Sequence, residues 1–192
     1  MKAVPNPLEM DAAASAGSGK EARALYEANV GYVWNSLRRL GIADADREDL
    51  CHEVFLVFFR GTSFDPSRPI RPWLFGIAFR VASDHRRRAR FRREVVAPVD
   101  HAVAREPAAD EALAQKEARR LVESGLLALD LDQRAVFILH EIDGLAMPEI
   151  ARALEAPLNT LYSRLRLGRR KFEAAVQRAA TPPRGVAIGG GR

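Results

Sequence analysis

The chain has 192 residues, of which 47% are hydrophobic and 29% are charged, so it can bury one or two small cores and is not disordered throughout. The formal net charge is +5, and arginines cluster at 80–93 and 164–170, which indicates a polyanionic partner. No apolar run reaches the ~18 to 20 residues of a membrane span, and no secretion signal opens the sequence, so we expect a cytoplasmic protein without membrane insertion.

Residues 1–19 are rich in Ala, Gly, Ser and Pro and lack helical periodicity, which predicts a disordered N-terminus. Apolar residues then recur at helical spacing from about 21 to 40, and Gly41 supplies a stop signal. This pattern predicts a first helix, bent near Gly31.

The second helix is predicted over about 47–60, with Asp44 or Asp46 as its N-cap. From the residues alone, Phe55 and Phe59 are expected in the core, although an exposed Phe beside acidic residues would indicate a protein-binding surface. The other positions expected to face the core are Leu50, Val54, Val57 and Phe58.

A turn-rich connection at 61–72 leads into a third helix, predicted from about 73 to 92. One side of its wheel is apolar, and the other mixes aromatic side chains with arginines. That mixture suits single-stranded DNA, because rings stack on unpaired bases while guanidinium groups hold the backbone. Duplex DNA, RNA and a merely solvated basic face are the alternatives. The packed stripe comprises Leu74, Ile77, Ala78, Val81 and Ala82, and the other side comprises Trp73, Phe79, Arg80, Ser83 and Arg87.

The segment 94–110 has no apolar period and predicts a linker between two domains. Residues 111–129 are predicted to be helical, and Asp130 or Asp132 is expected to cap the following helix. The Pro- and Gly-rich tail from 177 is expected to be disordered. Because no strand pattern occurs, the chain is predicted to be all-α, with two small helical domains joined by a flexible linker.

Helical runs at 137–142, 147–154 and from 158 past Lys171, with a break at 155–157, predict a helix-turn-helix in the second domain. The last helix has a packed stripe and an opposite face that is polar and cationic, which fits the DNA major groove. An ordinary helical hairpin with a solvated face is the alternative. The stripe comprises Leu158, Leu161, Leu165, Gly168 and Phe172, and the opposite face comprises Asn159, Ser163, Arg166 and Arg170.

No phosphate-cradling Gly loop, zinc-type Cys/His spacing or Ser/His/Asp set is recognisable. We therefore predict no catalytic residue, no metal site and no cofactor, and we do not expect an enzyme. Cys51, the only cysteine, forms no intramolecular disulfide; it is expected to pack, with redox sensing as the remote alternative.

These motifs, in this order, resemble a bacterial sigma factor of the extracytoplasmic-function group. EDLCHEVFLVFFR resembles the region 2 helix that docks on the clamp helices of the RNA polymerase β′ subunit, and FDPSRPIRPWLFGIAFRVASDHRRR is similar to the adjoining segment that reads and melts the −10 element. DLDQRAVFILHEIDGLAMPEIARAL and PLNTLYSRLRLGRRKF resemble region 4, which binds the −35 element and the β flap.

The resemblance implies region 2 at 20–93, region 4 with a winged-helix-like helix-turn-helix at 111–176, and tails at 1–19 and 177–192. It implies a protein that binds core RNA polymerase, directs promoter-specific initiation on promoter DNA, is held by an anti-sigma factor, and is nucleoid-associated when bound to polymerase.

The resemblance also assigns three groups of residues. It reverses the preference for Phe55 and Phe59 as core residues, because both match polymerase-contacting positions. The polymerase group is Asp49, His52, Glu53, Phe55 and Phe59; the −10 group is Trp73, Arg80, Arg86, Arg87, Arg88 and Arg90; the −35 group is Asn159, Tyr162, Ser163, Arg164, Arg166, Arg169 and Arg170.

Some positions depart from the family pattern. His52 stands where Gln is frequent and Arg80 where Asn is common, which leaves the base preferred at −10 open. Glu155 and Asn159 occupy frequent Gly positions, and Asn tolerates left-handed geometry better than Glu does. Ala146 replaces a usual Ser cap, a loss of about 1 kcal/mol if nothing else substitutes.

Two rival functions use parts of the same pattern. A polymerase-independent regulator would use only the helix-turn-helix of 130–172 and bind duplex DNA alone. A nucleoid or RNA-binding protein would use SDHRRRARFRRE without sequence preference. Neither rival requires the acidic and aromatic helix at 48–59.

Overall fold

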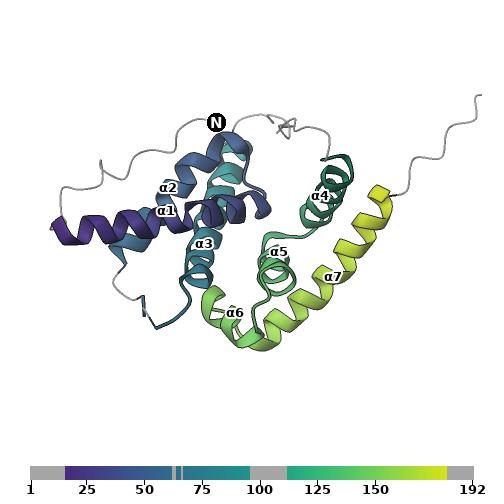
Figure 1. Cartoon of the computed structure of the whole chain (residues 1–192). Helices are drawn as coiled ribbons and strands as arrows, with labels where there is room; N and C mark the ends of the chain where they lie inside the picture. Colours follow the sequence, from purple (N-terminus) through teal and green to yellow (C-terminus); the bar gives the residue numbers. More distant parts are fainter. Residues whose placement is uncertain (1–15, 62–63, 66, 96–111, 181–192) are drawn as a thin grey trace, which may run out of the picture.

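The computed structural model describes residues 16–61, 64–65, 67–95 and 112–180, and every regular element among them is helical (Figure 1). This confirms the all-α fold class. Most of the predicted linker and of the two predicted disordered ends lies outside the described residues. The elements are α1 (Ala16–Arg39), α2 (Asp44–Arg60), α3 (Ile70–Val95), α4 (Ala112–Leu127), α5 (Leu131–Phe137), the π-helical segment η2 (Ile138–Ile142), α6 (Met147–Leu154) and α7 (Leu158–Ala180).

Several helix boundaries differ from the prediction, including the starts of α2 at Asp44 and of α3 at Ile70, which were expected near 47 and 73. Helix α1 begins at Ala16, α3 continues to Val95 and α7 continues to Ala180, so short parts of the predicted tails and linker are helical. Helix α1 also runs through Gly31 as one element. Composition alone does not show where a helix frays, because small and charged residues are tolerated at both helix ends.

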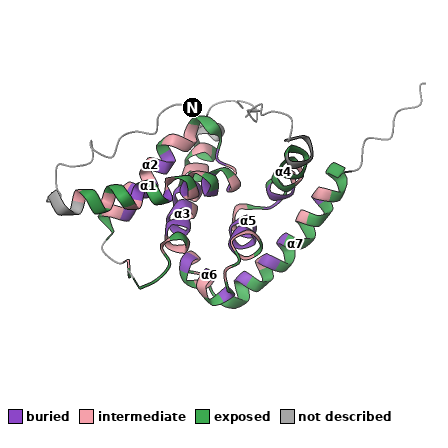
Figure 2. Ribbon diagram, viewed as in Figure 1, coloured by how far each residue is buried: buried purple, intermediate pink, exposed green. Residues whose placement is uncertain are grey.

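The first domain consists of α1, α2 and α3 around an apolar core. The stripe predicted for α3 is confirmed, and the middle of this helix is mostly buried (Figure 2). The fully or nearly fully buried side chains of that stripe are Leu74, Ile77, Ala78, Val81 and Ala82.

Helix α2 corrects two sequence predictions. Its N-cap is Ala43, which makes no side-chain cap, and Asp44 lies in the first turn, where it pairs with Arg47 at 2.7 Å. An acid inside the first turn still complements the helix dipole, so neither Asp44 nor Asp46 is needed as a cap. Val57 was expected in the core but is 44% exposed.

The second domain consists of α4, α5, η2, α6 and α7, and α7 packs along both α4 and α5 (Figure 1). The ring of Phe172 on α7 stacks on Phe137 at 4.5 Å and covers Gly125 of α4, where a Cβ would lie 2.4 Å from the ring. The predicted helix at 147–154 is confirmed. Asp130 is the N-cap of α5, as expected, and accepts a hydrogen bond from the Gln133 amide at 2.9 Å.

The two domains pack against each other, with α6 against α3 and the second domain also touching the end of α1 (Figure 1). Among the described residues, no helix combines the length and apolar character that crossing a bilayer requires. The sequence did not indicate whether the domains would touch.

We expect Asp130→Ala to lower the free energy of unfolding by roughly 1 kcal/mol, because the amide that it caps would lose its acceptor. Asp130→Asn keeps a cap acceptor but removes the charge that pairs with Lys171 at 3.3 Å, so it should lose only a few tenths of that amount. Urea unfolding followed by circular dichroism measures both. Equal losses would show that the charge, and not the cap, stabilises this turn.

Candidate polymerase and nucleic-acid interfaces

The outer face of α2 carries three of the residues assigned to polymerase contact. Asp49 is exposed, while His52 and Glu53 are half-buried, and their spacing places them on one side of the helix. The Glu53 carboxylate lies 3.5 Å from the guanidinium of Arg88 on α3. This face is therefore acidic at Asp49, whereas the charge of Glu53 is partly neutralised by Arg88 of α3.

The two phenylalanines assigned to polymerase contact have different environments. Phe55 is 0% exposed, and its ring lies 4.6 Å from that of Tyr26, so assigning it to a polymerase contact is wrong in this arrangement. Helical spacing turns Phe55 toward α1, as the core preference from the residues alone had indicated. Phe59 is half-buried and stacks on Phe55 at 6.3 Å, so its contact with polymerase stays a prediction.

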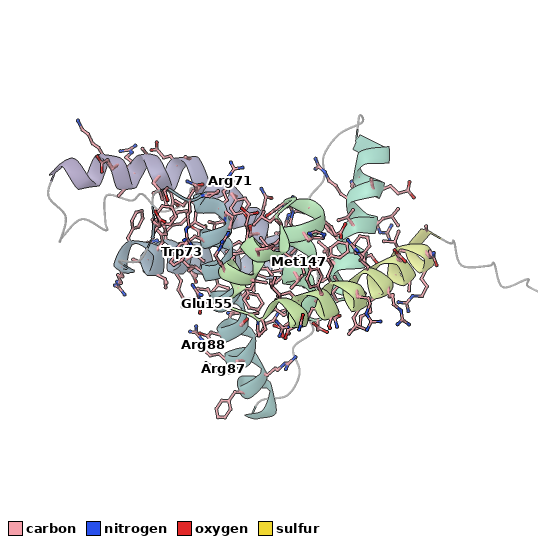
Figure 3. The ribbon with its side chains drawn as sticks, turned by 90° about the horizontal axis from the view of Figure 1, so that it is seen from below. Arg71, Trp73, Arg87, Arg88, Met147 and Glu155 are labelled. Carbon is pink, nitrogen blue, oxygen red and sulfur yellow. The ribbon has the colours of Figure 1, made fainter. Side chains whose placement is uncertain are left out.

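Helix α3 carries one stripe formed by Gly76, Arg80, Ser83 and Arg87, which follow helical spacing. Arg80 and Arg87 are exposed. Arg80 donates to the Glu155 carboxylate of the second domain at 2.6 Å, and Figure 3 shows Glu155 alongside α3, between Trp73 and Arg88. A carboxylate thus holds the guanidinium that was assigned to −10 DNA.

The remaining −10 residues differ in their exposure. Trp73 is half-buried, with its ring 6.2 Å from that of Phe64. Arg87 pairs with Asp84 of its own helix at 3.1 Å, and the exposed Arg90 makes no ion pair with another described residue. Arg87, Arg88 and Arg90 are accessible at the end of α3 (Figure 3 labels the first two).

Arg86 differs from the other arginines of the −10 group in its contacts. Its guanidinium donates to the backbone carbonyl of Leu40 at 2.8 Å, at the end of α1. Burial, with a smaller effect of the nearby Arg90, lowers the pKa of Arg86. The side chain therefore ties α3 to α1, and its contact with −10 DNA stays a prediction.

Helix α7 separates its packed and open faces largely as predicted. Leu161, Leu165 and Gly168 are buried, and Phe172 is half-buried. Leu158 is 41% exposed, so its predicted place in the packed stripe is wrong; the stripe begins one turn later, at Leu161. The exposed residues on the open face are Asn159, Tyr162, Ser163, Arg166 and Arg170.

Two arginines of the −35 group point toward neighbouring helices. Arg164 pairs with Asp132 of α5 at 2.6 Å, and Arg169 pairs with Glu141 of η2 at 2.6 Å. Arg166 and Arg170 make no ion pair with a described residue. The open cationic face of α7 therefore consists mainly of Arg166 and Arg170.

The turn between α6 and α7 is centred on Glu155, which adopts a left-handed conformation with φ of 51°. A side chain at such a position is strained relative to glycine, as the comparison with the family pattern had indicated. At the other end of α6, the amide of Ala146 donates to the Glu149 carboxylate at 3.1 Å, which makes half of a capping box without a Ser side chain.

Polar contacts between the domains were missed by sequence reasoning. The Tyr32 hydroxyl of α1 donates to Asp143 at 2.8 Å, and Arg39 lies 3.3 Å from the same carboxylate. Burial and the neighbouring Asp143 raise the pKa of Tyr32. Such pairs join residues more than a hundred positions apart and leave no periodic signal.

Two further residues were also missed. Phe91 is 71% exposed and follows Arg87 and Arg88 at helical spacing, a pattern that could have been read from the sequence. Arg134 is 3% exposed and lies in a stretch that reads as ordinary amphipathic helix. Among the described residues, no group of His, Cys, Asp and Glu is arranged to hold a metal ion.

Comparison with known proteins places these surfaces in a family. Residues 25–92 match the family described as sigma-70 region 2, and residues 119–172 match sigma-70 region 4. The ECF RNA polymerase sigma factor SigL of Mycobacterium tuberculosis is 30% identical over 166 residues, which cover 85% of this chain and 93% of SigL.

Two solved structures have a similar arrangement. The sigma factor RpoE of Bartonella quintana, crystallised with the anti-sigma factor NepR, superposes with a TM-score of 0.66 at 21% identity, covering 82% of this chain and 98% of that one. CnrH in complex with the cytosolic domain of CnrY superposes with a TM-score of 0.58 at 26% identity, covering 84% and 90%. The first of these likenesses supports the fold alone.

Cys51 lies on the packed side of α2 with 0% exposure, and burial raises its pKa to about 12. Because the thiolate is the reactive form, we expect no reaction with Ellman's reagent at pH 8 while the chain is folded, and one equivalent in urea. Rapid labelling of the folded chain would contradict the packing role and would favour a redox role. A Cys51→Ser variant provides the reagent blank.

Proposed function

The chain belongs to the extracytoplasmic-function group of the sigma-70 family and directs promoter-specific transcription, and from this premise we propose how its surfaces divide that work. The observation that carries the proposal is the position of an acidic helix face beside a basic one in the first domain, with a second open cationic face on α7. RNA polymerase, and not this chain, forms the phosphodiester bonds of the transcript.

The outer face of α2 is the docking surface for the β′ clamp helices. Asp49, His52 and Glu53 supply charge and hydrogen-bonding groups there, and Phe59 adds an apolar edge. Charged groups at a rim steer association, whereas partly buried apolar groups slow dissociation. This combination suits a partner that must bind and later be released.

The basic end of α3 contacts the −10 element. Arg87, Arg88 and Arg90 can bind backbone phosphates, and Trp73 and the exposed Phe91 are aromatic surfaces on which unpaired bases can stack. Arg80 joins this group only when Glu155 leaves it. Rings and guanidinium groups together favour a melted strand over an intact duplex.

The open face of α7 lies in the major groove of the −35 element, and the second domain also contacts the β flap. Arg166 and Arg170 bind phosphates or guanine edges, and Asn159, Tyr162 and Ser163 can reach bases. Because the two DNA contacts are covalently linked, each raises the effective concentration of the other, and promoter spacing as well as sequence is selected.

An anti-sigma factor is the proposed negative regulator. The support is that two similar structures, of RpoE and CnrH, were solved with the anti-sigma factor NepR and with the cytosolic domain of CnrY. The polymerase-independent regulator is less favoured, since the match to SigL spans both domains. On this proposal the protein acts at the nucleoid when it is bound to polymerase.

We expect Asp49→Arg to reduce co-purification with core RNA polymerase about tenfold or more, because it places a like charge where the partner must be cationic. Glu21→Arg makes the same charge change at an exposed site of α1 and serves as the control. The measurement is pull-down of core polymerase by tagged full-length chain. Retained binding of the Asp49 variant would contradict the docking assignment.

For the second DNA contact, promoters are first found by mapping start sites on fragmented genomic DNA with the chain and core polymerase alone. On such a promoter, Arg166→Ala and Arg170→Ala should each lower the slope of log K against log salt by about 0.9, one phosphate contact. Arg164→Ala should lower it less, because Asp132 already pairs with that guanidinium. An equal or larger effect at Arg164 would contradict the assignment of the open face.

A further inference from the structure

Two apolar side chains are exposed beside each other at the start of α7. Leu158 is 41% exposed and Tyr162 is 56% exposed, whereas Leu161 and Leu165 of the same helix are buried. Residues four apart on a helix adjoin, so Leu158 and Tyr162 form one apolar pair. A single exposed leucine needs no explanation, but an adjoining leucine and tyrosine at the start of the second helix of a helix-turn-helix indicate a contact.

The stripe that carries this apolar pair becomes cationic further along α7. In steps of four residues it continues through Arg166 and Arg170, which are exposed and make no ion pair with another described residue. Phosphates flank every base pair of a duplex, so two arginines that bind phosphates also bring the apolar pair against DNA. The cations therefore favour DNA over an apolar protein surface as the partner of this stripe.

Helix geometry places the apolar pair nearer the bases than the arginines. In a helix-turn-helix, the N-terminal residues of the second helix contact base edges. At a rise of about 1.5 Å per residue, Arg166 and Arg170 lie roughly 12 and 18 Å further along the axis than Leu158. The major groove is about 12 Å wide. With the start of α7 at the floor of the groove, both arginines therefore lie near the phosphates at its edges.

The side chains at the start of α7 limit which base feature they can recognise. Residues 158–163 include no charged side chain, and the next residue, Arg164, pairs with Asp132 at 2.6 Å. This part of the helix therefore lacks the free guanidinium group that would bind a guanine edge. The apolar group that a base presents in the major groove is the C5-methyl of thymine. A leucine beside an aromatic ring suits that methyl group.

We propose that Leu158 and Tyr162 recognise the C5-methyl group of a thymine in the −35 element. The proposal rests on the function assigned above to the open face of α7. The methyl group packs against the leucine side chain and the tyrosine ring, which removes apolar surface of all three groups from water. Arg166 and Arg170 hold the helix on the phosphates, and the apolar pair selects a T·A base pair at one position.

The test removes that methyl group from the DNA. On a promoter mapped with the full-length chain and core RNA polymerase, each thymine of the −35 element, on either strand, is replaced singly by deoxyuridine. Deoxyuridine pairs with adenine as thymidine does and lacks only the methyl group. The measurement is the dissociation constant of the chain bound to core polymerase on each DNA. We expect the replacement at one position to weaken binding roughly fourfold, which is the effect of leaving one methyl group unburied.

Variants of the chain assign this effect to the apolar pair. Leu158→Ala and Tyr162→Ala should each lower the ratio of the deoxyuridine to the thymidine dissociation constant from about fourfold to below about twofold. Tyr162→Phe keeps the ring and should keep the fourfold ratio. Leu167→Ala is the matched control and should also keep it, because Leu167 is 39% exposed on the same helix but lies outside the stripe. Because the ratio is measured within each variant, a general loss of affinity or stability cancels.

Two results would overturn the proposal while the promoter function stands. One is normal initiation from a −35 element that has no thymine or that tolerates deoxyuridine at every thymine. The other is a fourfold ratio that persists in either alanine variant, because the methyl group would then not lie against both side chains. If the unmodified chain with core polymerase started no specific transcripts, the promoter function itself would fail, and the thymine contact with it.

Discussion

The convergence of two guanidinium groups on the carbonyl of Leu40 is the contact on which the arrangement of the chain depends. Arg86 of α3 and Arg134 of α5 both donate to this oxygen at 2.8 Å. The end of α1 is therefore linked to α3 within the first domain and to α5 in the second domain. Arg134 donates further to the carbonyls of Leu127 and Leu129. Burial lowers its pKa to about 10, which leaves it charged at neutral pH. The C-terminal end of a helix is electronegative, and carbonyl groups at the ends of α1 and α4 bind this cation.

Gly41 makes this convergence possible. Its φ of 85° turns the chain sharply after α1, and a Cβ there would lie 2.2 Å from a terminal nitrogen of Arg134. Sequence reasoning identified Gly41 as a helix stop and could go no further. A stop signal is local, whereas the Arg134 side chain that donates to the Leu40 carbonyl lies 94 positions away. The role of Arg134 could not be predicted for the same reason, because contacts with backbone carbonyl oxygens leave no pattern in the sequence of side chains.

Local patterns were read far more reliably. The buried stripes of α3 and α7, the cap at Asp130 and the bounds of α6 follow from periodicity and end signals. Phe55 shows where family resemblance misled: spacing alone had placed it in the core, and it is there. The arginine clusters indicated a polyanionic partner, but the sequence could not show which guanidinium groups are held by acids of the same chain. That depends on how the domains meet.

The contacts between the two domains differ in strength. An exposed pair such as Arg80 with Glu155 contributes about 0 to 1 kcal/mol. A hydrogen bond from a buried charge contributes more, roughly 1.5 to 3 kcal/mol, so the Arg134 contact with Leu40 is the stronger link. Two of the three carbonyl partners of Arg134 belong to its own domain and stay with it when the domains part. Separating the domains would therefore break one of the three carbonyl bonds of Arg134, together with the hydrogen bond from Tyr32 to Asp143.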